Sequence, residues 1–166
     1  MRDCNYGLNN IGIYSTLQTM AFNRLQQYGT FVSTPPVPGI LLHYVYDAKL
    51  KNELPYWDRF PLCLPTDLYE DGWLGLNLHY VPQKTRQTIL NELYKYADYN
   101  PRARVEASYK LLKGASIFDD VKPCIKRYLT THVKSRLLEI NPVHWDKIIK
   151  LPTAQWQNST PYKGAK

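Results

Sequence analysis

The fold of this chain is decided by residues 54–82, which read LPYWDRFPLCLPTDLYEDGWLGLNLHYVP. Prolines at 61 and 65 enclose a short apolar run, a pattern typical of an edge strand or of a strand that turns a barrel corner. After the turn signal EDG, the run WLGLNLHYV alternates with the period of a strand. We expect the large aromatics to fill the core of a small, strongly bent β-structure: Trp57, Phe60, Trp73 and Tyr80.

The segments that follow and precede this stretch supply a further strand and then helices. Residues 40–47, ILLHYVYD, are rich in β-branched and aromatic side chains and predict a strand. Residues 83–134 predict an insertion of three helices, of which the last begins at Asp119 or Asp120. The inward faces predicted for the first two helices are Ile89, Leu90, Leu93, Tyr94 and Ala97, followed by Val105, Tyr109 and Leu112.

The end of the chain returns to strand spacing. Residues 136–141 predict a closing strand, and Asn141 followed by Pro142 predicts the start of a short helix at 142–150. The order of elements predicts an α+β fold: a small SH3-like β-barrel or a bent antiparallel sheet, with strands in 40–81 and 136–141 and the helical insertion between them. Residues 40–153 form the core domain in this prediction, and residues 154–166 a polar tail.

Residues 1–39 predict an extended N-terminal arm. The stretch IYSTLQTMAFNRLQQY at 13–28 has apolar side chains at helical spacing, and Gly29 would end that helix. Prolines at 35, 36 and 38 then forbid a regular helix and favour an extended strap. Such an arm suits packing on a neighbouring subunit, although packing within the chain explains it nearly as well.

Cysteine content and apolar runs exclude several classes of protein. The three cysteines are odd in number and far apart, so they predict neither a disulfide framework nor a zinc knuckle. The opening MRDCNYGLNN lacks the apolar stretch of a secretory signal, and no run approaches the roughly 20 apolar residues of a membrane span. These features predict a soluble protein in a reducing compartment, without a cofactor or a metal site.

Positive charge is concentrated in the middle of the chain. The net charge is +7, and the segment from Lys84 to Arg136 holds twelve basic and five acidic residues. A positive face there would suit nucleic acid or another polyanion, and a solvated helical face is the simpler explanation. The candidates for phosphate contact lie on the third predicted helix and just after it: Lys122, Lys126, Arg127, Lys134 and Arg136.

The residues offer little support for catalysis. No nucleotide-binding glycine loop is present in the sequence, and no two histidines stand at the i, i+4 spacing of a helical metal pair. A hydrolase that uses Cys63, or His79 with a nearby aspartate, is the third alternative, but the surroundings of Cys63 predict a packed thiol. We therefore expect a protein that is not an enzyme.

Several blocks of the sequence resemble one protein family. They are YVYDAKLKNELPYWDRFPL, GWLGLNLHYVP, SYKLLKGA, KPCIKRYLTTHVKSRLLEI and PVHWDKIIKLPT, in this order between Tyr44 and Thr153. They resemble a family of small proteins, without established catalytic residues, encoded by tailed bacteriophages and especially by marine phages with contractile tails. The resemblance implies a phage gene product and a probable component of the virion.

Taken together, these features predict a structural component of a phage particle: tail, baseplate or neck. It would be made in the host cytoplasm, reside in the virion and contact other virion proteins in several copies of a ring or symmetric complex. The alternative is a phage protein that binds nucleic acid through the basic residues. The contacts expected for the arm and tail are Ile13, Leu17, Met20, Leu25, Pro35, Pro36, Pro38, Trp156 and Tyr162.

Overall fold

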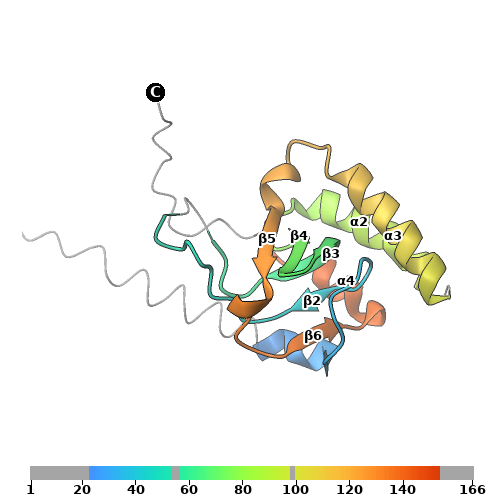
Figure 1. The fold of residues 1–166 in the computed structure, drawn as a ribbon. Coiled ribbons are helices and arrows are strands. Elements are labelled where there is room, and N and C mark those ends of the chain that lie inside the picture. The colour runs from blue at the N-terminus through green and yellow to red at the C-terminus, as the bar shows by residue number, and fades with distance from the viewer. Residues whose placement is uncertain (1–22, 54–56, 98–99, 154–166) are drawn as a thin grey trace, which may run out of the picture.

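The computed structural model describes residues 23–53, 57–97 and 100–153 (Figure 1). Its strands are β1 (Gly29–Val32), β2 (Leu42–His43), β3 (Leu62–Tyr69), β4 (Gly72–Asn77), β5 (Ile125–Leu129) and β6 (Leu137–Ile140). Its helices are α2 (Gln83–Tyr94), α3 (Pro101–Ala115) and α4 (Trp145–Ile149). Short 3-10 turns occur at η1 (Gln26–Tyr28), η2 (Lys122–Cys124), η3 (Thr130–His132) and η4 (Pro142–His144).

The strands form one six-stranded sheet in the order β1-β6-β2-β3-β4-β5. Each neighbouring pair is antiparallel, and β1 and β5 lie at the two edges. The α+β class and the antiparallel sheet with helices inserted between β4 and the last strands are confirmed. The sheet is an open row, so the bent-sheet form of the prediction describes it, and the SH3-like barrel remains a prediction.

One face of the sheet carries the larger core. Figure 1 shows α2 and α3 side by side, and α2 also contacts α4. Leucines of β3 and β4 meet the buried sides of α2, α3 and α4, as their alternation along the strands requires. Leu64 and Leu76, for example, lie in one cluster with Leu90, Leu112 and Ile148.

The opposite face carries a second, aromatic cluster. It contains Tyr44, Tyr46, Trp73 and Tyr128, and we call these four residues the buried tyrosine cluster. The rings of Trp73 and Tyr128 stack with centroids 5.9 Å apart, and Tyr44 meets Trp73 edge-on at 5.5 Å. The predicted alternation of β4 is thereby confirmed, because Trp73 faces this cluster and Leu76 and Leu78 face the helices.

The third predicted helix, at 119–134, is wrong. Only the 3-10 turns η2 and η3 are helical there, and β5 lies between them. The residues from Ile125 to Leu129 pair with the outer edge of β4, which satisfies their backbone groups and places Tyr128 opposite Trp73. Pro123 lies in the first turn of η2, where the missing N–H of proline costs no hydrogen bond.

Two predicted inward side chains point outward instead. Tyr94 of α2 is 52% exposed and Tyr109 of α3 is 39% exposed. Helix α3 packs on the sheet through smaller residues, since its buried side chains are Ser108, Leu112 and Ala115. Ile89, Leu90 and Leu93 are buried as predicted.

The described part of the predicted arm belongs to the sheet. Residues 23–25 are helical, and Gly29–Val32 form β1, which pairs with β6. Leu25 is 3% exposed and lies in the larger core, so it has no surface to offer a partner. Pro38 is buried, Pro36 is half-buried and Pro35 is exposed. The other predicted contacts, Ile13, Leu17, Met20, Trp156 and Tyr162, lie outside the described residues.

A buried arginine joins the helical layer to the end of β4. Arg86 of α2 is fully buried, and its guanidinium donates to the carbonyls of Ile148 and Leu151 at 3.2 and 2.6 Å. It also donates to the carbonyl of Val81 at 3.1 Å. Carbonyl oxygens carry partial negative charge, and those at the end of α4 add the helix dipole, so they compensate part of the cost of burying the cation. Arg86 therefore holds α4 in place and is not available to a ligand.

Candidate nucleic-acid interface

The five basic residues predicted to contact phosphate fall into two separate groups. Lys122, Lys126 and Arg127 lie in η2 and β5, at one edge of the sheet. Lys134 and Arg136 lie on the connection from β5 to β6, and the guanidinium of Arg136 stands 5.4 Å from the ring centroid of Phe31 in β1, the opposite edge strand. The single helical face that was predicted for them is therefore wrong, because their segment is a strand and a crossover.

Arg127 meets an exposed aromatic ring. Its guanidinium carbon lies 4.0 Å from the ring centroid of Tyr69, well within the range of a cation–π contact. Tyr69 ends β3 and is 51% exposed. Arg127 also pairs with the carboxylate of Asp71 in the turn between β3 and β4. Its contacts with the Tyr69 ring and with Asp71 together hold the Arg127 side chain over the ring.

Helix α3 brings a second tyrosine and a second cation to the same place. Lys113 donates to one oxygen of the Asp67 carboxylate at 2.7 Å, and the hydroxyl of Tyr109 donates to the other at 3.2 Å. The Lys113 ammonium also lies 5.6 Å from the ring centroid of Tyr109. Asp67 is two residues before Tyr69 in β3, so this contact ties the exposed side of α3 to the strand that carries Tyr69.

We call these four residues the tyrosine patch: Tyr69, Tyr109, Lys113 and Arg127. The irregular register of β3 between Pro65 and Asp67 helps to create it, since a bulge bends the strand and re-aims the side chains that follow. Partial burial raises the pKa of the Asp67 carboxyl, but the hydrogen bonds from Lys113 and Tyr109 outweigh it and hold that pKa below its ordinary value. The bond to Asp67 in turn raises the pKa of Lys113, which keeps this cation charged.

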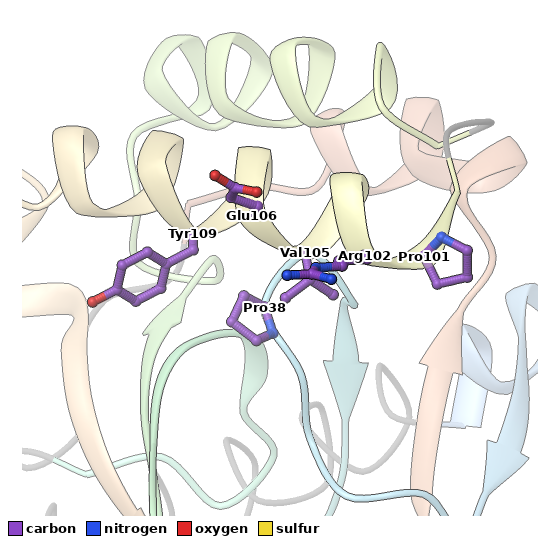
Figure 2. Close-up of a pocket in the computed structure, with 6 residues that line it drawn as sticks. All are labelled: Pro38, Pro101, Arg102, Val105, Glu106 and Tyr109. Carbon is purple, nitrogen blue, oxygen red and sulfur yellow. The ribbon is translucent and has the colours of Figure 1, made fainter.

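A shallow hollow continues the patch along α3. It has a volume of about 530 Å³, and Figure 2 shows Val105 and Tyr109 of α3 beside Pro38, which lies in the loop between β1 and β2. Arg102 also lines it, and Figure 2 draws the Arg102 side chain at Val105, with Pro101 toward the start of the helix. The exposed side of α3 thus presents the cations Arg102 and Lys113, and between them lie Val105 and Tyr109 together with the exposed ion pair of Glu106 and Lys110. Flat rings flanked by cations are what a nucleobase and its phosphates require.

A buried polar cluster lies elsewhere, where β3 and β4 approach Asp58. The Asp58 carboxylate accepts from the Asn77 amide at 2.8 Å and lies 3.6 Å from Nδ1 of His79. Burial raises the pKa of this carboxyl, but the bonds from His79 and Asn77 lower it further than burial raises it. Burial lowers the pKa of the neighbouring His43 to about 3. The Asp58 carboxylate thus holds the loop and β4 together with its acceptors occupied by protein.

Cys63 does not have the surroundings of a nucleophile. It is fully buried in the aromatic cluster, and burial raises the pKa of its thiol to about 12. A buried thiol with a raised pKa is mostly protonated at neutral pH, which is the state of a packed cysteine rather than of an activated one. Within the described ranges, no three ligand-type side chains come together as a metal site would need, and no helix is long and apolar enough to span a membrane.

The sequence pointed to only one of the four patch residues, Arg127. Tyr109 was assigned to the core because it stands at helical spacing with Val105 and Leu112, and Tyr69 and Lys113 carry no local motif. One signal in the sequence could have shown that Tyr109 faces outward. Ser108 and Ala115 have small side chains on one side of the helix, and a helix packs closely on a sheet through such a side.

One family model matches the chain, over residues 24–166, and its description is "Phage T4 terminal DNA protecting protein". No curated protein and no solved structure matches the chain. The match supports the predicted phage origin. It overturns the predicted role as a structural tail, baseplate or neck component in a symmetric assembly, since the family is described by an action on DNA ends. The alternative reading, contact with nucleic acid, is the one that agrees with it.

Proposed function

Because the chain belongs to the family of phage T4 terminal DNA protecting proteins, we propose that it binds the ends of linear phage DNA and shields them from exonucleases, without catalysing a reaction. The match over residues 24–166 carries this proposal, because it spans the whole described structure except Asn23. The net charge of +7 supports it, since a basic protein is attracted to the phosphate backbone over several ångströms.

A protein that protects an end must distinguish it from the interior of a duplex. The interior offers phosphates and groove edges, whereas an end also offers the open face of its last base or base pair. Phosphate contacts alone cannot tell the two apart, but an exposed aromatic ring can stack on an open base face. The tyrosine patch combines both elements, which supports it as the part of the surface that recognises the end.

We also propose that the protein travels in the virion with the DNA that it protects, in a phage with a contractile tail. A linear genome has two ends, so the expected copy number per particle is small, on the order of the number of ends, rather than that of a ring component. Quantitative mass spectrometry of purified, nuclease-treated particles measures it. Absence from particles would contradict this location while leaving DNA-end protection open.

Exonuclease protection of linear DNA tests the function directly. A blunt duplex is incubated with the purified protein and then with an exonuclease that enters at duplex ends, and the surviving full-length DNA is measured over time. We expect survival to rise with protein concentration and to fall as salt is raised, because phosphate contacts release counterions. Unchanged digestion at protein concentrations that coat the DNA would contradict the proposal.

A matched control separates protection of ends from general coating. The same duplex closed into a circle and carrying one internal nick is treated with a nuclease that cuts at the nick. A protein that recognises ends should leave this cleavage unaffected at concentrations that fully protect the linear duplex. Equal protection of both substrates would indicate non-specific binding instead.

A further inference from the structure

We propose that the tyrosine patch is the site that captures the DNA end, with the ring of Tyr69 stacked on the open face of the terminal nucleobase and with Arg127 and Lys113 on its phosphates. This inference rests on the proposed function and adds the place and the chemistry of recognition. The ligand is the open face of an end base, whether it belongs to a blunt base pair or to a single-stranded overhang.

The guanidinium of Arg127 lies over one face of the Tyr69 ring, 4.0 Å from its centroid, and Tyr69 is 51% exposed. The place proposed for the base is the opposite face of the ring. A base placed there completes a stack of guanidinium, phenol ring and nucleobase. Arg127 polarises the ring from one face, and the base occupies the opposite face. Stacking of this kind tolerates any base sequence.

The patch is held in place before any ligand binds. Tyr69 ends a strand that pairs with β4 as far as Gly72, and α3 is anchored on the sheet by three buried side chains. Asp67 links the two elements through Tyr109 and Lys113. Gly114 follows Lys113 on the exposed side of α3, and a side chain added to it would meet nothing within 4 Å. Little ordering is therefore needed on binding.

The acidic partner of Arg127 does not prevent phosphate binding. Asp71 is 68% exposed at its side chain, and an ion pair between exposed side chains contributes only about 0.2–1 kcal/mol. A phosphate can accept two hydrogen bonds from one guanidinium, which is the stronger arrangement. A phosphate can therefore replace the Asp71 carboxylate on Arg127 at little cost, and the carboxylate meanwhile keeps Arg127 aimed over the ring.

Binding to two DNA molecules of the same sequence tests the site. One is a hairpin with a single open end and a fluorophore in its loop, and the other is a dumbbell closed at both ends and labelled in the same loop. The ratio of their dissociation constants measures the preference for an end. We expect Tyr69→Leu to weaken hairpin binding by roughly 5- to 150-fold, the range for loss of one base–aromatic stack, and to leave dumbbell binding within about twofold.

Two variants act as controls for Tyr69→Leu, and a third tests the phosphate contact of Lys113. Tyr69→Phe keeps the ring and should keep the preference for the hairpin, because the stack needs no hydroxyl. Tyr94→Leu removes a tyrosine of nearly equal exposure, 52%, from α2, and should bind like the wild type. Lys113→Ala should lower the slope of log affinity against log salt by about one on the hairpin. Thermal melting monitored by circular dichroism checks that each variant is folded.

The outcomes separate the two proposals. If the wild type binds hairpin and dumbbell equally, recognition of ends fails as a function. If the wild type prefers the hairpin but Tyr69→Leu keeps that preference, the function stands and the tyrosine patch is not its site. A loss shared equally by hairpin and dumbbell also overturns the site, because it marks a general DNA contact. Running the hairpin with a blunt end and with a short overhang shows which kind of end the ring accepts.

Discussion

The two tyrosine-rich regions of this molecule lie on opposite faces of the same strands, and they differ in what surrounds the rings. Arg127 and Tyr128 are neighbours in β5, so their side chains point to opposite faces of the sheet. Tyr128 enters the buried tyrosine cluster, where its ring meets Trp73 and Tyr44. Arg127 enters the tyrosine patch, where it covers the exposed ring of Tyr69.

This difference shows why a high tyrosine content does not by itself indicate function. In the buried cluster the rings remove apolar surface from water, and burial raises the pKa of the Tyr44 hydroxyl, which no ligand reaches. In the patch the rings stay half exposed and each has a cation within 6 Å of its centroid. The first arrangement stabilises the fold and the second is suited to binding an anion with flat bases.

The largest effect should come from the buried side. Trp73→Ala removes a side chain that is 2% exposed and stacked on Tyr128, and should lower the free energy of unfolding by about 3–5 kcal/mol. Tyr69→Ala, on the exposed side of the same hairpin, should lower it by no more than about 1 kcal/mol. Urea denaturation followed by tryptophan fluorescence and circular dichroism measures both. Equal losses would mean that the patch, too, is part of the core.

An intermediate effect should appear as pH falls. The folded state holds the pKa of His43 at about 3, whereas an unfolded histidine titrates near its ordinary value of 6.5. Between these values the unfolded chain binds more protons, so stability falls with falling pH at up to about 1.4 kcal/mol per pH unit, or about 2 kcal/mol between pH 6.5 and 4.5. The lowered pKa of Asp58 adds a loss only below about pH 4, where its unfolded carboxyl becomes protonated.

Urea denaturation at several pH values checks this slope, and His43→Gln provides the comparison. The variant should be less stable at neutral pH, because the bond from the His43 ring to the Pro61 carbonyl is altered, but its stability should fall less between pH 6.5 and 4.5. Parallel slopes for the two proteins would show that a group other than His43 carries the dependence.

The smallest effect should come from a single charge beside the patch. Asp71→Asn removes the carboxylate that competes with phosphate for Arg127, and should strengthen binding to an open DNA end by about two- to fivefold at low salt. Asp146→Asn removes another exposed acid, 51% against 68% for Asp71, which is paired with Lys147 in α4, and controls for the change in net charge alone. Fluorescence anisotropy with the open hairpin measures both, and an equal gain would place the effect outside the patch.

Much of the sheet and of the helical layer could be predicted from local pattern. The alternation of β4 assigned Trp73 and Leu76 to opposite faces, and helical spacing assigned Ile89, Leu90 and Leu93 to the core. The start of the last helical segment was also correct, since the Asn141 side chain accepts from the backbone of Val143 and Pro142 follows the cap. These features are local, because each depends on neighbours within a few residues.

The candidate site could not be predicted in the same way. The spacing of residues 119–134 fits a helix as well as a strand, and only the free edge of β4 favours the strand. Once β5 is a strand, Arg127 and Tyr128 face opposite ways and the five basic residues no longer share a face. Tyr69 and Tyr109 are 40 residues apart in the sequence and meet through Asp67 only after α3 docks on β3.

The sequence by itself therefore determined the class of the fold, the two faces of β4, the cores of the first helices and the excess of positive charge, because periodicity and composition act over short distances. The tertiary structure alone decided that 125–129 is an edge strand, that Arg86 is buried among carbonyls, and that Arg127 lies over Tyr69. These outcomes depend on which unpaired strand edge, buried acceptor or exposed ring a distant segment meets, and that information exists only once the chain is folded.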